Sequence, residues 1–592
     1  MVGYDECLPA AALTVPSCHP SLEKFKKRPE WRFNALLMAV ILGVFVTVNN
    51  GALRSYFSDD DFSNLAIFEP WWSLVKSAFT LALIPNFRPL GAMFYKAMGP
   101  LAGFHFAAYV LVLQAFHIAT ALLLWLFLRR LGLRQLPAAL GCAFFTLHMS
   151  TLPAYWKPMY ILDVLCGFWV ILALLFYQRD RFFLSLLCAW LAFKSKEMEL
   201  MLPVVLLLYE WFFGRQRNSG RLRWKPLIPF FLMSLSFGLQ SLMIPRIPVT
   251  GYTAQLTAAS LWSGIAYYGG KLLYAPFFGL IVSIGLLFLR LRIVTWGVFG
   301  FWILMAPMFG FPGRQFEAYL YVPLLMFAVA VAGVAQWRPW WAVVFLIFWI
   351  PASYHEFWTE RKPLIAYNYD HIPYVNQILQ SLAVHPAPTA VVYDGTPNDF
   401  KDWGQRGLFR FALASYDLPV YSTAEPEAQD AIRRPGALLF TWDELHTQLH
   451  TISFPSDGRE MSYVDFGKDN PFWQMKAGWM PLSANCRWTT LRSVITLRQP
   501  TGDVDFSMRV NLEPGQAGSL HQLIRVSSGG QTIGEHRFVK SGLQTLSWPV
   551  SSRTESVKDF EIAMDPAFNL PNSDALGVNI CACGFLPHAQ GH

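Results

Sequence analysis

Long apolar segments alternate with short charged segments over the first 360 residues of the chain, and the alternation then stops. A helix that crosses a bilayer needs about 20 mainly apolar residues. Residues 1–30 are polar and contain no apolar signal core, so the first span is predicted to be a retained anchor. We predict about eleven spanning helices, over residues 33–50, 104–128, 136–150, 159–177, 181–194, 198–213, 226–244, 266–289, 293–309, 318–336 and 339–357.

The composition changes near Trp358, where the sequence becomes that of an ordinary soluble protein. Strands are expected at 389–394 and 436–441, with a helix at 404–415, which indicates a small α/β unit. Short β-rich runs follow from about 475, with Gly, Pro, Ser and Asp between them, and they favour a β-sandwich, in the manner of a jelly roll. The predicted domains are a tail (1–32), a membrane domain (33–357), the α/β unit (358–470) and the β-sandwich (471–592).

The formal net charge of +8 arises largely from Lys and Arg clusters at every second span end. Such clusters mark the cytoplasmic side. We therefore predict a multi-pass protein of the cell inner (plasma) membrane, with a cytoplasmic N-terminus and a periplasmic or extracellular C-terminal domain. The charges need no nucleic-acid partner. The clusters are Lys24–Arg32, Arg129–Arg134, Arg179 with Arg181, Arg215–Lys225, Arg290 with Arg292, and Arg338.

Three of the eight cysteines fall in the predicted exported domain. A bridge from Cys486 to either Cys581 or Cys583 is expected in an oxidising compartment. The Cys-x-Cys spacing is poor for zinc, and one thiol would be left over.

The first predicted outer loop carries three adjacent carboxylates, Asp59, Asp60 and Asp61, before a segment at 62–82 that reads as an interfacial helix. Crowded carboxylates raise one another's pKa or hold a cation. One of them, with Asp59 as the candidate, could instead cap a helix. Arg88 precedes a proline in the same loop, and a fixed Arg suits phosphate binding. The alternative is an Arg that touches lipid headgroups.

Further polar residues recur at the outer ends of later spans. Asp163 falls about one turn inside the fourth span, where an unpaired carboxylate is costly; Lys157 or His148 is its expected partner. In the stretch Lys194–Glu199, the two end residues are expected in a solvated turn.

The connection before the tenth span holds Arg314 and Glu317, one helical turn apart, which could pair. Tyr319 and Tyr321 follow, and an aromatic belt is the alternative interpretation of both. A helical bundle would bring these outer polar residues together in one outward-facing cavity. Acidic groups beside phosphate-binding cations, next to lipid, suit a lipid-phosphate substrate and a reaction that needs a general base.

The order of these short motifs resembles the GT-C superfamily of membrane glycosyltransferases. The membrane part, over roughly residues 31–340, is most similar to the O-mannosyltransferases that carry tetratricopeptide repeats, and to their bacterial relatives. The chain departs from that family at Met149 and Pro153, and it reads Glu317-Ala318-Tyr319 for Glu-Arg-Tyr. It also lacks a tetratricopeptide array. The matching motifs are Asp60-Asp61-Phe62, Arg88-Pro89-Leu90, Phe104-His105 with His117, Phe144–His148 with Asp163, Ser195-Lys196-Glu197 with Leu202-Pro203, and Glu317–Pro323.

The resemblance implies a polyprenyl-phosphate-linked sugar donor and an acceptor hydroxyl on the outer side of the membrane. The acceptor, whether glycan, lipid or protein, stays open, and so does the bridging of carboxylate and phosphate by a divalent cation. The implied catalytic residues are Asp60 as the base, then Asp61, with Asp163 to orient the acceptor or a cation. The implied substrate-binding residues are Arg88, His148, Lys157, Lys196, Glu197, Arg314, Glu317, Tyr319 and Tyr321.

Two other functions compete with this reading. A transporter or flippase for lipid-linked sugars also needs many spans and charged residues within the membrane, although inverted repeats, which would favour transport, are not evident in the sequence. A non-catalytic scaffold that binds a partner through its exported domain is the second. It would leave Asp60, Arg88, Asp163 and Lys196 without a common purpose.

Overall fold

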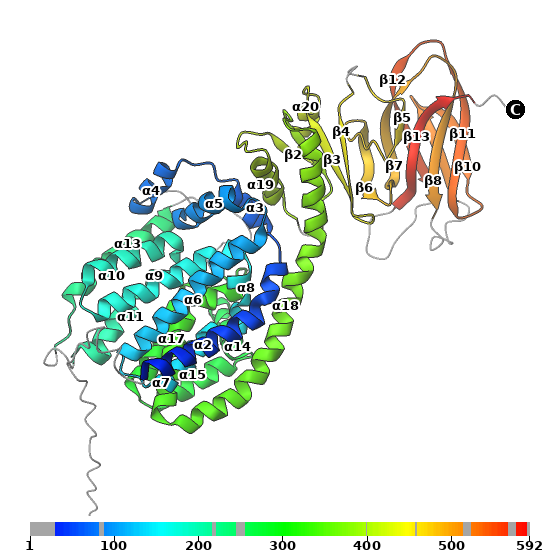
Figure 1. Ribbon diagram of the computed structural model, residues 1–592. Coiled ribbons are helices and arrows are strands. Elements are labelled where there is room, and N and C mark those ends of the chain that lie inside the picture. The colour runs from blue at the N-terminus through cyan, green and yellow to red at the C-terminus, as the bar shows by residue number, and fades with distance from the viewer. Residues whose placement is uncertain are drawn as a thin grey trace, which may run out of the picture. The chain divides into compact units, whose positions relative to one another are not determined.

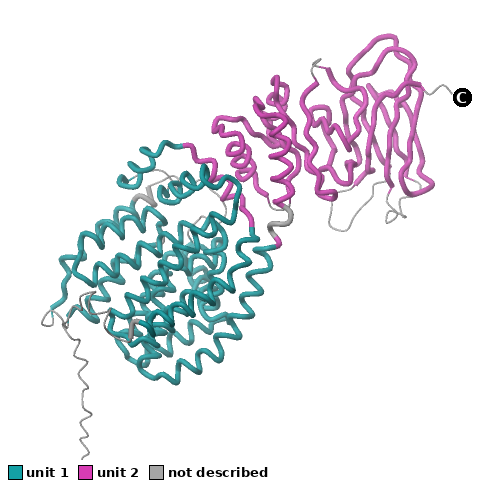
Figure 2. Tube along the Cα trace, in the orientation of Figure 1, with its two compact units in different colours: residues 1–55, 69–365 teal, residues 56–68, 366–592 magenta. Residues whose placement is uncertain are grey.

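A computed structural model describes residues 30–81, 88–215, 221–243, 255–397, 400–455, 459–512, 522–565 and 576–588 of the chain (Figure 1). The chain divides into two compact units (Figure 2). Unit 1 contains residues 1–55 and 69–365, and unit 2 contains residues 56–68 and 366–592. The segment 56–68, which lies early in the sequence, is therefore part of the unit that contains the C-terminus.

Unit 1 is a bundle of helices. They include α4 (Trp71–Phe79), α5 (Pro89–Ala102) and α8 (Leu152–Trp156). The others are α2 (Glu30–Asn49), α6 (Phe106–Arg130), α7 (Gln135–Thr146), α9 (Ile161–Gln178), α10 (Phe182–Ser195), α11 (Leu202–Tyr209), α13 (Ile228–Met243), α14 (Ala258–Leu273), α15 (Phe278–Phe288), α16 (Arg292–Met305), α17 (Tyr321–Trp337) and the first part of α18 (Pro339–Val384).

Fewer helices than predicted are long and apolar enough to cross a membrane. In the described part of the chain there are four: Arg32–Arg54, Phe106–Arg130, Pro158–Gln178 and Glu317–Trp337. Two bent helix pairs raise the number to six, and three further apolar helices have only 10–17 residues. The prediction of about eleven spans is thus confirmed only as a set of several apolar helices.

The predicted single span at 266–289 shows why the number differs. It is two helices, α14 and α15, bent by 83°. Tyr274 and Phe277 both have φ of 60°, a left-handed conformation that ends an α-helix, and Pro276 lies between them. Hydrophobicity marked the whole segment as apolar but did not mark this break.

Helix α17 forms the centre of unit 1. It is apolar on all sides, as expected of a helix surrounded by others, and 89% of its most apolar window is buried. Small residues let neighbouring helices approach it closely. A Cβ on Gly141 of α7 would lie 2.6 Å from the carbonyl oxygen of Ala328, and one on Gly297 of α16 would lie 2.6 Å from the amide nitrogen of Ala330.

Helix α18 is a continuous helix of 46 residues. The domain boundary that composition places near residue 358 therefore falls inside a helix, and the division between the compact units comes at 365 and 366. A second difference is α5, which forms within the predicted first outer loop. Its first residue, Pro89, suits the first turn of a helix.

The small α/β part of unit 2 contains the expected strands. β1 (Val391–Asp394) and β3 (Leu438–Asp443) run parallel, with Val391 opposite Leu438. With β2 (Val420–Ser422) and β4 (Gln448–Ser453) they form a sheet in the order β2-β1-β3-β4. Two helices accompany it, α19 (Asp402–Ala412) and α20 (Ala428–Ile432).

The β-rich part of unit 2 is one connected, mostly antiparallel sheet of nine strands in the described residues. The predicted sandwich is thus not two separately bonded sheets. The strands surround a core that includes Phe506, Phe560 and Phe585. They are β5 (Tyr463–Asp465), β6 (Met475–Ser483), β7 (Cys486–Gln499), β8 (Gly502–Leu512), β9 (Leu523–Ser528), β10 (Gln531–Arg537), β11 (Gly542–Ser552), β12 (Ser556–Asp565) and β13 (Leu576–Pro587).

A disulfide joins Cys486 at the start of β7 to Cys581 in β13. This confirms the expected bridge and selects between its two possible partners. Cys583 is a buried free thiol that belongs to the hydrophobic core of this sheet.

Candidate active site

A buried ion pair joins Asp163 to Lys196. The Nζ atom of Lys196 lies 2.5 Å from Oδ1 of Asp163, and the two side chains are only 7% and 2% exposed. The expectation that Lys157 or His148 pairs with Asp163 is thus corrected. Helices α9 and α10 form an antiparallel hairpin that turns near Asp180, and residues 163 and 196 are almost equally far from the turn. The hairpin therefore places them side by side.

Aromatic and unpaired polar groups complete the surroundings of this pair. The Nζ atom of Lys196 lies 4.4 Å from the ring centroid of Tyr319, a cation–π contact. The second carboxylate oxygen of Asp163, Oδ2, is buried and has no hydrogen-bond partner in the described part of the chain. Buried polar atoms are normally satisfied, and Oδ2 is free to accept a hydrogen bond.

Arg88 and Glu197 form a second pair beside the first. The Nε and Nη2 atoms of Arg88 donate to the two carboxylate oxygens of Glu197, at 3.0 and 2.6 Å. The side chains are 26% and 43% exposed, so the pair is open to solvent. Burial would raise the pKa of Glu197, but the charge of Arg88 and its hydrogen bonds outweigh that effect and lower the pKa to about 2.

The two end residues of the Lys194–Glu199 stretch are not in a solvated turn, contrary to expectation. Both are buried. Lys194 donates to the backbone oxygen of Thr80 and lies 5.5 Å from the ring of Trp190. Glu199 accepts a hydrogen bond from the thiol of Cys166 at 3.4 Å. Antiparallel packing around α10 buries Lys194 and Glu199, although the sequence pattern predicts a solvated turn for both.

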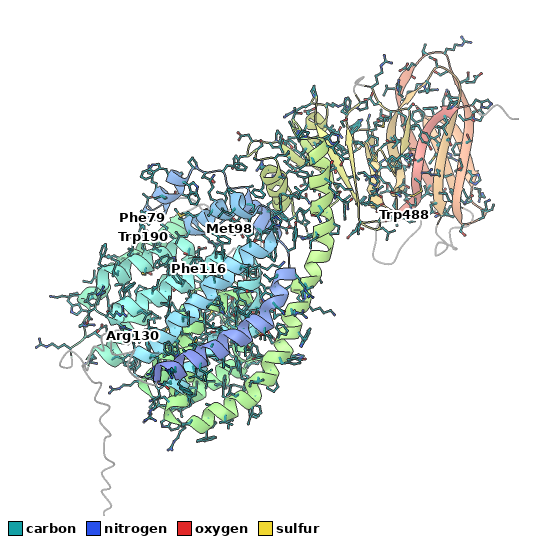
Figure 3. The ribbon with its side chains drawn as sticks, viewed as in Figure 1. Phe79, Met98, Phe116, Arg130, Trp190 and Trp488 are labelled. Atoms are coloured by element: carbon teal, nitrogen blue, oxygen red, sulfur yellow. A yellow bond between two sulfur atoms is a disulfide. The ribbon has the colours of Figure 1, made fainter. Side chains whose placement is uncertain are left out.

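The same region anchors the interfacial segment of the first loop. The indole nitrogen of Trp190 donates to the backbone oxygen of Ala78 in α4 at 2.7 Å, and Trp190 and Phe79 lie close together in Figure 3. Trp72 on α4 is 75% exposed. Helix α4 covers only part of the segment 62–82 that is predicted as one interfacial helix, and its position at a membrane interface stays a prediction.

A second charged cluster surrounds Lys271 of α14. Its Nζ atom lies 3.4 Å from Glu317, 3.0 Å from Glu356 and 2.8 Å from Glu360. Tyr267 donates to Glu317 at 2.5 Å. Glu317 thus contacts Lys271 and Tyr267, and the guanidinium of Arg314 lies 5.9 Å from the ring of Phe316.

Sequence reasoning missed four members of this cluster, namely Tyr267, Lys271, Glu356 and Glu360. Lys271 was hidden inside a predicted apolar span. Glu356 and Glu360 are four residues apart at the end of the last predicted span, a spacing that places both on one helix face. That spacing was the available signal.

The short helix η8 (Glu317–Leu320) links the two clusters. Glu317 reaches Lys271, and Tyr319, two residues later, lies against Lys196. The cations and carboxylates of both clusters therefore gather around one segment of unit 1.

Three other predicted residues are in the interior of unit 1. The hydroxyl of Tyr321 is 2.8 Å from Nδ1 of His117, so Tyr321 is part of the core and not of an aromatic belt. His148 is buried, with Nε2 3.0 Å from the backbone oxygen of Leu272. Lys157 is also buried, between α8 and the short helix η3 (Pro158–Tyr160).

The three acidic residues of the first loop belong to unit 2, at the start of α3 (Asp59–Leu65). Ser58, and not Asp59, is the N-cap residue; its N–H and hydroxyl both donate to Oδ2 of Asp61, at 2.7 Å each. Asp59 accepts the backbone N–H of Lys401 at 3.1 Å. Asp60 is exposed, and its Oδ1 accepts the indole N–H of Trp403 at 2.9 Å.

Helix α3 is held against α19 by close backbone contact within unit 2. A Cβ on Gly404 would lie 2.8 Å from the Cα of Asp59, and one on Gly407 would lie 2.4 Å from the backbone oxygen of Phe62. Only glycine allows this approach. The contact holds α3 in place against α19, and it therefore also positions Asp60, which is part of α3.

The residues present offer limited support for a divalent cation. No group of three or more His, Cys, Asp or Glu side chains that could hold a metal occurs in the described ranges. Magnesium is commonly held by one or two carboxylates together with substrate phosphates. Asp163 could supply such a carboxylate through Oδ2, and donor phosphate would have to supply further oxygens.

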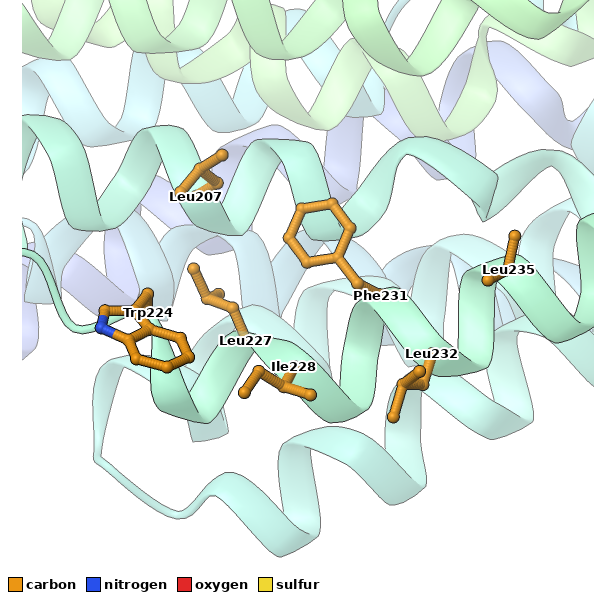
Figure 4. A pocket seen from close by; sticks show the side chains of 7 residues that line it. All are labelled: Leu207, Trp224, Leu227, Ile228, Phe231, Leu232 and Leu235. Carbon is orange, nitrogen blue, oxygen red and sulfur yellow. The ribbon is translucent and has the colours of Figure 1, made fainter.

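An apolar groove lies between α11 and α13 (Figure 4). Its volume is about 440 Å³. Among the described lining residues, the indole nitrogen of Trp224 is the one polar side-chain atom, so this lining suits a hydrocarbon chain. The lining residues are Leu207, Trp224, Leu227, Ile228, Phe231, Leu232 and Leu235.

Comparison with known proteins gives one distant similarity. No protein-family model and no curated protein matches the chain. A cryo-EM structure of the arabinofuranosyltransferase AftD from mycobacteria is similar, with a TM-score of 0.44, 11% identity, and coverage of 95% of this chain and 59% of that chain. Two structures of an AftD mutant are similar with TM-scores of 0.37 and 12% identity, covering 94% and 95% of this chain and 62% and 61% of theirs.

The present chain thus spans about three-fifths of the length of AftD. At 11% identity the similarity places no individual residue of the present chain.

Proposed function

We propose that this protein is a membrane glycosyltransferase of the GT-C type. It moves a sugar from a polyprenyl-phosphate donor to an acceptor hydroxyl at the outer, non-cytoplasmic face of the membrane. The observation that carries the proposal is the convergence of Arg88, Asp163, Lys196, Glu197 and Tyr319 in unit 1, from segments more than 200 residues apart in sequence.

The cations of this cluster suit the departing lipid phosphate. Arg88 uses two of its five N–H groups on Glu197, so three remain for phosphate oxygens. Lys196 donates to Asp163 and keeps two further N–H donors. Fixed positive groups at the position where negative charge develops lower the barrier of group transfer.

Each cation is held by its own carboxylate, which has a physical consequence. The positive groups are in place before the donor arrives, so little reorganisation accompanies the reaction. The open pair, Arg88 with Glu197, can rearrange around a headgroup. The buried pair, Asp163 with Lys196, acts as the fixed support. Oδ2 of Asp163 is left to accept a hydrogen bond from the acceptor or from water.

Asp60 is the proposed general base. One of its oxygens accepts the indole N–H of Trp403, which orients the carboxylate and leaves the other oxygen for a substrate hydroxyl. Asp61 is less suited, because it is fully buried and its Oδ2 accepts two hydrogen bonds from Ser58. A base must reach the proton that it removes, and Asp60 is the accessible carboxylate of the three.

We expect the Lys271 cluster to bind the sugar of the donor. Carboxylates accept hydrogen bonds from sugar hydroxyls, and three of them, on Glu317, Glu356 and Glu360, surround a single lysine. Since η8 joins this cluster to Lys196 and Tyr319, a sugar there would lie next to the phosphate site.

A transfer assay tests the proposal. Membranes that contain the protein are incubated with radiolabelled polyprenyl-phosphate sugars and candidate acceptors, and labelled product is separated from donor. The wild-type protein should produce labelled product. The Asp60→Asn variant should lose about 10²- to 10⁴-fold in rate, the usual share of a general base, with unchanged expression and membrane insertion.

The Trp403→Phe variant is the matched control, because it keeps the Asp60 carboxylate and removes only its hydrogen bond. It should lose far less activity than Asp60→Asn. Full activity of Asp60→Asn would remove the base assignment. Movement of intact donor across the membrane without any sugar transfer would favour the transporter.

A further inference from the structure

A cleft of about 750 Å³ lies in the small α/β part of unit 2, apart from any residue assigned to catalysis. It is located where α18 ends, at the amino ends of β1 and β3 and the carboxyl end of β4. Its volume is in the range typical of ligand sites, roughly 300–1,000 Å³. The residues that define its chemistry are His385, Arg433, Arg434, Ser453 and Phe454.

The walls of the cleft are rigid. Pro386, Pro388, Pro435 and Pro455 all line it, and proline fixes its own φ angle. Thr389 ties two wall segments together, because its hydroxyl donates to the backbone oxygen of Pro435 at 2.8 Å and its N–H donates to Gly436 at 3.2 Å. A preformed site loses little conformational entropy when a ligand binds.

The cleft is positively charged. Two adjacent arginines and a histidine line it, and none of its described lining residues carries a carboxylate. Arg433 has a distant acidic neighbour, Glu460, at 3.9 Å. Arg434 is exposed, and none of the described contacts occupies its guanidinium. An arginine without an internal partner offers its planar fork to a carboxylate or phosphate.

An aromatic ring lies beside these cations. The guanidinium carbon of Arg433 is 5.3 Å from the ring centroid of Phe454. The ring of Phe454 also contacts Trp473, with centroids 5.3 Å apart and ring planes tilted by 56°. Phe454 is only half-buried, so the accessible part of its ring can contact the apolar C–H face of a sugar ring.

We propose that this cleft binds an acidic carbohydrate. One sugar ring packs against Phe454, and the anionic group of the chain, a uronate carboxylate or a sugar phosphate, is held by Arg434 with Arg433 beside it. This binding site lies in unit 2 and goes beyond the proposed transfer reaction. Its test measures binding, so it can fail or succeed independently of catalysis.

The test uses the full-length protein in lipid nanodiscs and isothermal titration calorimetry. The probes are a tetragalacturonate, a phosphorylated mannose oligosaccharide, maltotetraose as the neutral control, and inorganic phosphate. One or both of the acidic oligosaccharides should bind, with an affinity that falls as salt is raised. Which of the two binds more tightly identifies the anionic group. Maltotetraose and inorganic phosphate should bind at least tenfold more weakly.

Variants assign the binding to this cleft. Arg434→Gln should weaken binding by at least about tenfold, because a hydrogen bond to a charged group is lost. Phe454→Leu should also weaken binding, because the sugar ring loses the aromatic ring against which it packs. Arg553→Gln removes an exposed arginine that does not line the cleft and should leave binding unchanged.

Three results would each overturn the proposal: no binding of either acidic oligosaccharide, equal binding of maltotetraose or of inorganic phosphate, or an Arg434→Gln variant that binds like the wild-type protein.

Discussion

Lys196 is a lysine in a place where an unpaired ammonium group would be very unfavourable. It is nearly fully buried, and Asp163 is its partner at 2.5 Å. Taking two charges out of water costs several kcal/mol each, and their mutual attraction offsets that cost only while both are present. The pair therefore holds the Lys196 ammonium group in a fixed position, and loss of one partner is worse than loss of both.

We expect Lys196→Met to lower the free energy of unfolding by about 3–5 kcal/mol, because it leaves the Asp163 carboxylate buried and alone. The double variant Asp163→Asn with Lys196→Met should regain most of that stability. It should still lack transfer activity, because the cation that stabilises the leaving phosphate is gone. Thermal unfolding of the detergent-solubilised chain measures stability, and a double variant less stable than the single one would contradict this account.

Glu197, which lies outside the predicted spans, makes a pH-dependent contribution to the stability of the folded state. Its pKa is about 2 in the folded protein, below the ordinary value of 4.5. A lowered carboxyl pKa stabilises the folded state above the unfolded pKa, and this contribution is lost as pH falls through the folded value. The side chain is 43% exposed, so solvent screening reduces the contribution.

We therefore expect the wild-type protein to have a higher Tm than the Glu197→Gln variant at pH 6. The difference should narrow below about pH 4.5 and vanish near pH 2. Comparison of the two proteins at each pH removes contributions from other groups, such as Asp443, whose pKa is also lowered. A difference that stays constant from pH 6 to pH 2 would show that the ion pair with Arg88 does not stabilise the fold.

At the scale of elements, helix α3 is a short helix of seven residues that carries the proposed base. A helix of this length is not stable alone. Two features hold it: the capping box of Ser58 and Asp61 at its start, and the glycine contacts of α19 along its side. The position of Asp60 thus depends on side chains that take no part in the proposed chemistry.

The Ser58→Ala variant should destabilise α3 by about 0.5–2 kcal/mol, the usual cost of removing a cap. Transfer activity should fall moderately, and much less than in Asp60→Asn, because the base is still present. Ser63→Ala, at an exposed position of the same helix, is the matched control and should have little effect. Equal losses in the two serine variants would argue against a capping role.

The helix hairpin of α9 and α10 is the element that builds the site. It brings Asp163 and Lys196 together from 33 residues apart, because both are near the end of the hairpin opposite its turn. Interhelical pairs of this kind follow from the turn position, and the short polar segment near Asp180 marks that position in the sequence.

At the scale of the whole molecule, the chain consists of two compact units, and unit 2 includes one segment that interrupts the sequence of unit 1. Residues 56–68 fold with the C-terminal unit, although both flanking segments belong to unit 1. The base candidate Asp60 therefore belongs to unit 2, and the phosphate-site candidates belong to unit 1.

The disulfide between Cys486 and Cys581 should stabilise unit 2, because it closes a loop between residues 95 apart in sequence. Removal of a native bridge typically costs about 2–5 kcal/mol. The double variant Cys486→Ser with Cys581→Ser should be cleaved faster by trypsin within unit 2, and Cys583→Ala should be affected far less. Cleavage at the wild-type rate in the double variant would contradict a stabilising role for the bridge.

The sequence by itself determined the features that depend on local composition and spacing. It predicted an apolar helical part followed by a β-rich soluble part, the strands β1 and β3, and a bridge from Cys486. It also predicted that Asp60, Arg88, Asp163 and Lys196 share one purpose, and that interpretation stays a prediction. Hydrophobic length, β-propensity and the cost of charge near a membrane are properties of a segment and its solvent, so they can be read without coordinates.

Only the tertiary structure decided who pairs with whom. In the tertiary structure Asp163 pairs with Lys196, and Glu317 pairs with Lys271. Two of the three acidic residues of the first loop are buried and make structural contacts, while Asp60 is exposed. It also broke an apolar segment into α14 and α15. These outcomes depend on backbone turns and on packing between distant segments. Pairing energies arise between groups that the sequence separates, and the fold alone sets the distance between them.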